Sequence, residues 1–209
     1  MATVLYIQAS PRGKRSKSIQ VADAFVNAYT LHHPDDTIET INLFEAVLPA
    51  FDGPAVAAKF KIPNGQPADS QERRAWTEVE AVIERFKAAD KYVLAVPMWN
   101  FSIPYRLKQY IDILVQPNYT FRVGENGYEG LVKGKQLLTV YARGGAYPKG
   151  TPGEAYDQQI RYIEQIFGFI GFTAIEALIV EPTLNQGEEE AKKAVASAIE
   201  QAKLLAQTF

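Results

Sequence analysis

The chain has 209 residues, of which 47% are hydrophobic and 22% are charged, and its formal net charge is −2. This length supports one substantial hydrophobic core, so we expect a single domain over residues 1–209. A charge so close to zero gives no general attraction to nucleic acid or to an anionic membrane, and the lack of cysteine excludes disulfides, thiolate chemistry and iron–sulfur clusters.

Five segments have the composition of β-strands: residues 4–7, 37–43, 92–96, 137–141 and 174–180. The first, third and fourth are nearly continuous apolar runs, which is typical of parallel strands covered on both faces. The second alternates less cleanly, and the fifth is again apolar.

Between these strands, apolar residues recur at steps of three and four, as amphipathic helices require. The predicted helices are residues 17–32, 70–89, 105–115, 155–169 and 188–206. Pro34 is expected to stop the first helix, and Ser70 is the expected cap of the second. Residues 188–190 are acidic, which the positive end of the helix dipole favours at the start of the last helix.

The alternation of strands and helices predicts an α/β fold, because right-handed crossovers place parallel strands in one sheet covered on both faces. Five strands favour a flavodoxin-like doubly wound five-stranded parallel sheet of order 2-1-3-4-5, with helices on both faces. Residues 44–69 and 116–134 interrupt the alternation. Excursions of this length usually form lids or partner contacts.

No segment predicts a membrane span or a secretion signal. Residues 1–3 lead directly into the first strand without a leader pattern, and the most apolar stretch, residues 166–175, is shorter than the roughly 18 residues that a spanning helix needs. We therefore expect a cytoplasmic protein that binds neither membranes nor nucleic acid.

Ligands of open parallel sheets bind beyond the carboxyl ends of the strands, where the strand order reverses. The loop after the first strand contains Ser10, Ser16 and Ser18 and ends in a helix, whose free N–H groups and positive dipole attract anions. It also carries four cations, namely Arg12, Lys14, Arg15 and Lys17. A phosphate fits this loop, although the serines can equally cap a helix beside solvated cations. The loop lacks the glycine patterns of dinucleotide and nucleoside triphosphate sites, so a monophosphate such as FMN remains.

The loop after the third strand carries the large apolar side chains Met98, Trp99 and Phe101. A flat ring needs such side chains against one face and backbone polar groups along its edge, which the main chain around Trp99 and Asn100 can supply. The same residues can equally serve only to pack the next helix onto the sheet.

The loop after the fourth strand contains Ala142, Arg143, Gly144 and Gly145. Paired glycines permit positive φ and a close approach of backbone N–H groups to a ligand, here the pyrimidine edge of a flavin. An ordinary turn has the same composition.

Together these residues resemble the FMN-dependent NADH:quinone oxidoreductase and azoreductase family, whose fold is flavodoxin-like. The resemblance rests on Ser10 and on residues 16–18, 98–101 and 143–145, and it extends to residues 121–122, 125–127, 129–131, 134–135 and 168–171. These matches span nearly the whole chain, and their joint pattern is more specific than any single motif.

The resemblance implies that Ser10, Ser16, Lys17 and Ser18 bind the FMN phosphate, that Met98, Trp99, Asn100 and Phe101 border the flavin ring, and that Ala142, Arg143, Gly144 and Gly145 border its pyrimidine edge. It also implies a homodimer with flavin sites at the subunit interface. Val123 departs from the family pattern, which often has an aromatic residue there near the partner's flavin. Tyr128 or Tyr119 can supply the aromatic ring near the partner's flavin instead. The preference for an electron acceptor depends on which residue lies there.

The expected activity is the transfer of two electrons from NADH or NADPH to quinones, and the reductive cleavage of aromatic azo compounds, by a ping-pong mechanism. Asn100 and Gly145 are the candidate catalytic residues, acting through electrostatic positioning because the flavin carries the chemistry. His32 and His33 lack the spacing of metal ligands, so no metal is expected. Two alternatives remain: a flavodoxin-type one-electron carrier, for which a more acidic surface is expected, and a cofactor-free interaction domain.

Overall fold

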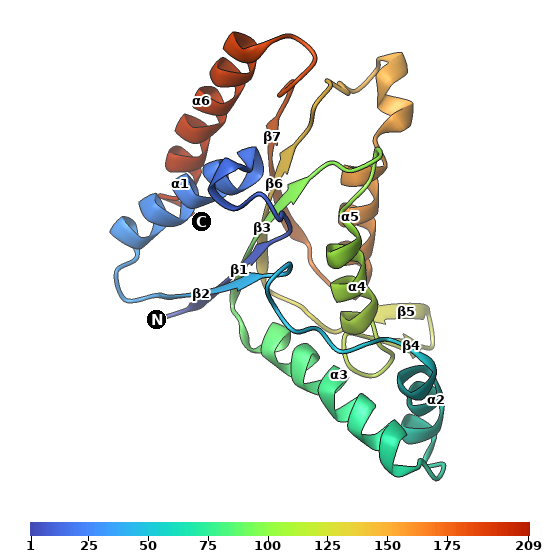
Figure 1. Ribbon diagram of the computed structural model, residues 1–209. Helices are drawn as coiled ribbons and strands as arrows, with labels where there is room; N and C mark the ends of the chain where they lie inside the picture. The colour runs from blue at the N-terminus through green and yellow to red at the C-terminus, as the bar shows by residue number, and fades with distance from the viewer.

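The computed structural model describes residues 1–209 and has a five-stranded parallel sheet between two layers of helices (Figure 1). The sheet strands are β1 (Thr3–Gln8), β2 (Thr37–Asn42), β3 (Lys91–Pro97), β6 (Gln136–Ala142) and β7 (Ala174–Val180). The helices are α1 (Lys17–His32), α2 (Gly53–Lys61), α3 (Ser70–Ala88), α4 (Tyr105–Leu114), α5 (Gln158–Ile170) and α6 (Glu188–Leu205). Three short 3-10 helices are Gly13–Arg15, Ile62–Asn64 and Pro152–Tyr156. The predicted flavodoxin-like α/β architecture is therefore confirmed.

The strand order needs correction. The sheet runs β2-β1-β3-β6-β7, which is 2-1-3-6-7 and not the predicted 2-1-3-4-5. The chain's fourth and fifth strands, β4 (Phe121–Gly124) and β5 (Gly127–Gly130), form a separate antiparallel hairpin. Each hairpin strand has only four residues, and neither has a fully buried residue. The hairpin therefore carries no apolar pattern from which it can be predicted.

Successive strand residues point to opposite faces of the sheet, and both faces are buried. Leu5 and Ile7 pack in one core with residues of α3, α4 and α5, whereas Val4 and Tyr6 pack in a second core with residues of α1 and α6. Figure 1 shows the same two layers on either side of the sheet. Burial on both faces explains why these strands are continuous apolar runs.

Two helices are capped by aspartates that the sequence did not indicate as caps. Asp69, not Ser70, caps α3: its Oδ1 accepts hydrogen bonds from the N–H groups of Gln71 (2.8 Å) and Glu72 (2.9 Å), and Glu72 accepts one from the Asp69 N–H. Asp157 caps α5 by accepting from Gln159 and Ile160 (both 3.1 Å), so this helix begins at residue 158 and not at 155.

The excursion over residues 44–69 contains α2, which the sequence reading treats as loop because prolines are frequent there. Pro54 lies in the first turn of α2, where its missing N–H breaks no hydrogen bond. Together with the start of α3, α2 extends away from the sheet (Figure 1). No helix of the chain combines the length and apolarity that crossing a membrane requires.

Gly130 fixes the hairpin to the end of α5. A Cβ atom at Gly130 would overlap the backbone of Ile170 and Gly171, and the Val132 N–H donates to the Ile170 carbonyl nearby (2.8 Å). A side chain of any size at position 130 therefore has to displace main chain and not a flexible side-chain end.

We expect Gly130→Ala to lower the free energy of unfolding by about 3 kcal/mol, the upper part of the usual range for overpacking. Gly168→Ala is the matched control, because Gly168 lies in α5 with open space around its Cβ position, and alanine there should raise the free energy by up to about 1 kcal/mol. Urea unfolding curves of both variants measure the difference. Equal midpoints would show that the hairpin does not press on α5.

Candidate functional site

The three loops with candidate site residues lie at one edge of the sheet. They follow β1, β3 and β6, which are neighbouring parallel strands, so their carboxyl ends meet. Backbone hydrogen bonds tie the loops together: the Ala9 N–H donates to the Ala95 carbonyl (3.0 Å), and the Met98 N–H donates to the Ala142 carbonyl (2.8 Å).

The loop after β1 presents buried hydroxyls and free backbone donors at the start of α1. Ser10, Ser16 and Ser18 are 1%, 2% and 0% exposed, and the Ser16 and Ser18 hydroxyls lie 3.1 Å apart. Although Ser16 occupies the N-cap position, its side chain caps no N–H group. The N–H groups of residues 17–19 likewise find no acceptor within the chain. This set of donors is suited to an oxyanion such as a phosphate.

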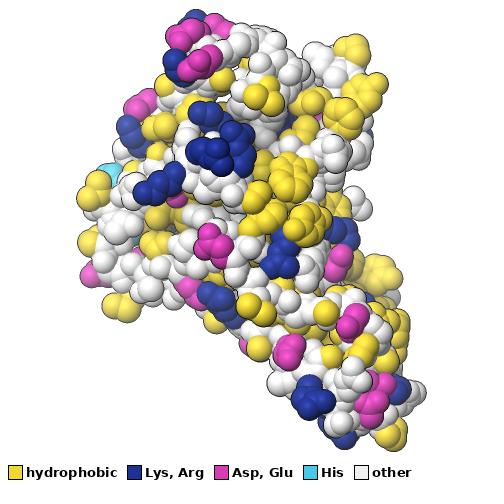
Figure 2. All heavy atoms as spheres, in the orientation of Figure 1, with side chains coloured by type: hydrophobic (Ala, Val, Ile, Leu, Met, Phe, Trp, Pro, Cys, Tyr) yellow, Lys and Arg dark blue, Asp and Glu magenta, His cyan; other side chains and the backbone are white.

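The cations of this loop have no acidic partners. Arg12, Lys14 and Arg15 are exposed, and none of them forms an ion pair; Lys17 is half-buried and reaches only Gln20 (3.4 Å). In Figure 2, Lys and Arg side chains gather over the start of α1, next to an apolar patch. The loop therefore carries a local positive field, which favours an anionic ligand.

The loop after β3 is a tight turn with a strained backbone. Trp99 and Ser102 exchange both backbone hydrogen bonds (3.0 and 2.9 Å), and the two residues between them have positive φ, 48° at Asn100 and 67° at Phe101. Positive φ is unusual for an aromatic residue and is concentrated at functional sites. The turn leaves the N–H groups of Asn100 and Phe101 without acceptors and exposes the side chains of Trp99 (37%) and Phe101 (47%). Met98 before the turn is half-buried.

The loop after β6 offers main-chain donors. The N–H groups of Gly144, Gly145 and Ala146 have no acceptor in the chain, although Gly145 is buried. Neither glycine has the positive φ that the sequence reading allows. Both are closely packed: a Cβ at Gly144 would lie 3.0 Å from the side chain of Leu184, and one at Gly145 would lie 3.1 Å from that of Asn185. Ala142, at the end of β6, is buried.

The side chain of Arg143 points into the protein and is only 1% exposed. Its guanidinium donates to Asp157 (2.8 Å), Glu181 (3.1 Å) and Gln159 (3.1 Å). The side chain of Arg143 therefore cannot contact a ligand, and only its main chain remains a candidate for binding. The sequence could not reveal this arrangement, because the three partners are 14 to 38 residues away.

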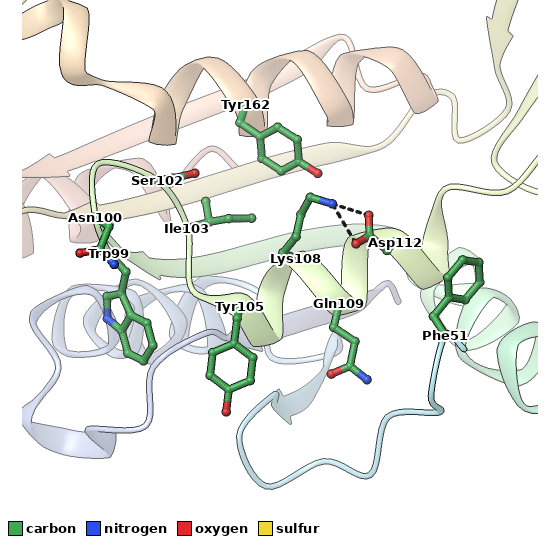
Figure 3. A pocket seen from close by; sticks show the side chains of 10 residues that line it. All are labelled: Phe51, Trp99, Asn100, Ser102, Ile103, Tyr105, Lys108, Gln109, Asp112 and Tyr162. Atoms are coloured by element: carbon green, nitrogen blue, oxygen red, sulfur yellow. Dashed lines mark hydrogen bonds and ion pairs between the residues drawn. The ribbon is translucent and has the colours of Figure 1, made fainter. Parts of the chain in front are cut away.

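A cleft of about 810 Å³ begins at the turn after β3 and continues along α4 (Figure 3). Trp99, Asn100 and Ile103 line one end, and Phe51 lies at the other. The middle is formed by side chains of α4 and α5: Tyr105, Lys108, Gln109, Asp112 and Tyr162. Its volume lies in the usual range for small-molecule sites. Sequence reasoning missed the residues of α4 and α5, whose spacing is that of ordinary helices.

The geometry thus provides an anion cradle, a strained aromatic turn and a row of backbone donors side by side, with a cleft next to them. Such an arrangement can hold a phosphorylated flat ring and leave room for a second small molecule. No group of three or more His, Cys, Asp and Glu side chains is placed to hold a metal ion.

Comparisons with known proteins agree with these features. Residues 2–205 match a family model described as having the flavodoxin-like fold. An FMN-dependent NADH:quinone oxidoreductase from Nitratidesulfovibrio vulgaris is 54% identical over 209 residues, with both chains fully covered.

Two solved structures from Bacillus anthracis are also similar. An azoreductase has a TM-score of 0.92 at 28% identity, with both chains covered completely. An FMN-dependent NADH-azoreductase in complex with FMN has a TM-score of 0.87 at 30% identity and covers 99% of this chain and 100% of its own. Since a relative is this similar over its full length, the chain belongs to the flavodoxin-like family of FMN-dependent NADH:quinone oxidoreductases.

Proposed function

We propose that this chain is an FMN-dependent oxidoreductase that transfers two electrons from NADH or NADPH to quinones and reductively cleaves aromatic azo compounds. The observation that carries the proposal is a set of polar groups at one sheet edge. It consists of the buried, mutually hydrogen-bonded hydroxyls of Ser16 and Ser18 and the free N–H groups of residues 17–19 and 144–146. The first two groups suit a phosphate, and the last suits the polar edge of a ring.

The proposed binding mode assigns a part of FMN to each loop. Ser10, Ser16, Lys17 and Ser18 hold the phosphate, and Met98, Trp99, Asn100 and Phe101 lie along the flavin ring. Residues 142–145 border the pyrimidine edge, with Arg143 contributing its main chain. FMN supplies a ring that takes up an electron pair from a nicotinamide and passes it on.

The protein contributes position and electrostatics rather than a general acid. Asn100 and the backbone N–H of Gly145 are the proposed catalytic groups, because fixed donors stabilise negative charge without reorganising at the moment of reaction. The exposed rings of Trp99 and Phe101 give the nicotinamide and the acceptor an apolar surface. We place the nicotinamide and the acceptor in the same cleft. Since the oxidised nicotinamide must then leave before the acceptor binds, we expect ping-pong kinetics.

The working form that we propose is a cytoplasmic homodimer in which residues 1–209 make a single domain. Val123 and Tyr128 on the hairpin are 73% and 71% exposed, and Phe60 on α2 is 62% exposed. Exposed apolar side chains on two protruding elements are suited to a subunit interface.

Ser16→Ala is expected to weaken FMN binding roughly 30-fold, because a hydrogen bond to a charged group contributes about 2 kcal/mol. Ser18→Ala should have a similar effect. Ser197→Ala, an exposed hydroxyl on α6, is the control. Fluorescence titration of the apoprotein with FMN measures the dissociation constants. Unchanged affinity in both Ser16→Ala and Ser18→Ala would remove the phosphate site from this loop.

Initial rates with varied NADH and quinone should give parallel double-reciprocal lines, because the oxidised nicotinamide leaves before the acceptor enters. Intersecting lines would mean that both molecules bind together. The same assay tests the alternative function, since a one-electron carrier does not oxidise NADH with a quinone unless a partner protein is present.

Sedimentation equilibrium should give a mass twice that of the 23.3 kDa chain. Tyr128→Glu is expected to shift the protein towards the monomer, because a carboxylate at the interface is costly to desolvate. Leu204→Glu is the matched control, as Leu204 is equally exposed (66%) but lies on α6. A wild-type monomer would refute the proposed assembly.

A further inference from the structure

Three ionisable side chains lie close together on the wall of the cleft. Lys108 and Asp112 lie one turn apart on α4, and Tyr162 faces them from α5 (Figure 3). Gln109 is engaged elsewhere, since it donates to the Pro49 carbonyl (3.1 Å). Lys108, Asp112 and Tyr162 therefore form one polar cluster in the cleft, beyond the turn at Trp99.

Lys108 and Asp112 form a close ion pair with no net charge. The Lys108 ammonium donates to both carboxylate oxygens of Asp112, at 2.6 and 2.8 Å, and it also contacts the hydroxyl of Tyr162. Burial lowers the pKa of Lys108, but the contacts with Asp112 and Tyr162 outweigh this effect, so its pKa lies above the usual value. The lysine therefore stays cationic and is balanced by Asp112.

Tyr162 keeps a free donor. It is half-buried, and its hydroxyl contacts the Lys108 ammonium, which can only donate and therefore leaves the phenol proton free. The ammonium lies 6.0 Å from the centre of the Tyr162 ring. Burial raises the pKa of Tyr162, and the nearby cation offsets part of this rise. The phenol thus remains protonated at neutral pH, with its O–H group available to the cleft.

We infer that Tyr162 and the Lys108–Asp112 pair select the electron acceptor, binding the uncharged carbonyl oxygen of a quinone in preference to an anionic substituent. This inference rests on the proposed function. A neutral carbonyl oxygen gains a hydrogen bond from the Tyr162 O–H, which the neighbouring Lys108 ammonium polarises. A sulfonate or carboxylate can accept the same bond, but it also meets the carboxylate of Asp112, which cancels the attraction of the cation.

Matched acceptors and variants test this selection. 1,4-Naphthoquinone and 1,4-naphthoquinone-2-sulfonate share a ring system and differ in charge. The variants are Tyr162→Phe, which removes the donor, and Asp112→Asn, which removes the balancing charge. Glu200→Gln is the control, because it breaks a similar helix-surface ion pair with Lys203 on α6.

For Tyr162→Phe we expect the KM for the neutral quinone to rise about fivefold, in line with one lost hydrogen bond, with kcat unchanged. For Asp112→Asn we expect the ratio of kcat/KM for the sulfonate to kcat/KM for the neutral quinone to rise about tenfold, because an uncompensated cation remains. This rise should shrink at high salt. Glu200→Gln should behave as wild type in both respects.

A second readout separates this inference from the proposed function. Trp99 lines the cleft and Trp76 is buried, so quenching of tryptophan fluorescence reports quinone binding to the FMN-loaded protein without turnover. If NADH fails to reduce the flavin but quinone affinity still depends on Tyr162 and Asp112, the proposed function fails and the selection stands. If neither variant changes affinity or the ratio between the two acceptors, the inference is wrong.

Discussion

A guanidinium removed from water must be paired, and the pairing of Arg143 holds the site edge of the sheet together. Its partners come from the start of α5 and from the segment after β7, and Gln159 also donates to the Val96 carbonyl in β3 (3.0 Å). The ends of β3, β6 and β7 are thereby joined to one helix start. Removing one partner of a buried ion pair typically costs about 3–5 kcal/mol, so this framework is much more resistant to deformation than surface loops joined by exposed charges.

That framework explains why, in the proposed function, main-chain groups bind the cofactor and side chains bind the acceptor. The donors at Gly144 and Gly145 are backbone groups whose positions follow from strand ends and from close packing against residues 184–185. The middle of the cleft, in contrast, is lined by side chains of α4 and α5, which can change without altering the sheet. In the proposed binding mode, cofactor binding is thus tied to the fold, whereas the inferred choice of acceptor depends on a few replaceable helix residues.

The parts predicted well from sequence are those governed by burial. Strands covered on both faces must be apolar throughout, so residues 92–96 and 137–141 were recognisable, and the periodicity of α1 gave its limits. The hairpin and α2 were missed because short exposed strands and a proline-containing helix resemble loop. Ser10, Ser16 and Ser18 could be predicted as site residues because their loop follows β1 directly. The direction of the Arg143 side chain could not, because it depends on partners that are distant in the sequence.

The turn at Asn100 and Phe101 also bears on the protein without its ligand. Two successive residues in a left-handed conformation persist only when their surroundings impose it, and here the paired bonds of Trp99 and Ser102, together with the Gln158 N–H that donates to the Phe101 carbonyl (3.0 Å), do so. The turn therefore adopts its conformation during folding, and no bound ligand is needed to impose it. If the turn binds the flavin ring as proposed, the apoprotein keeps the same binding surface, which makes it a suitable host for synthetic flavin analogues with altered redox chemistry.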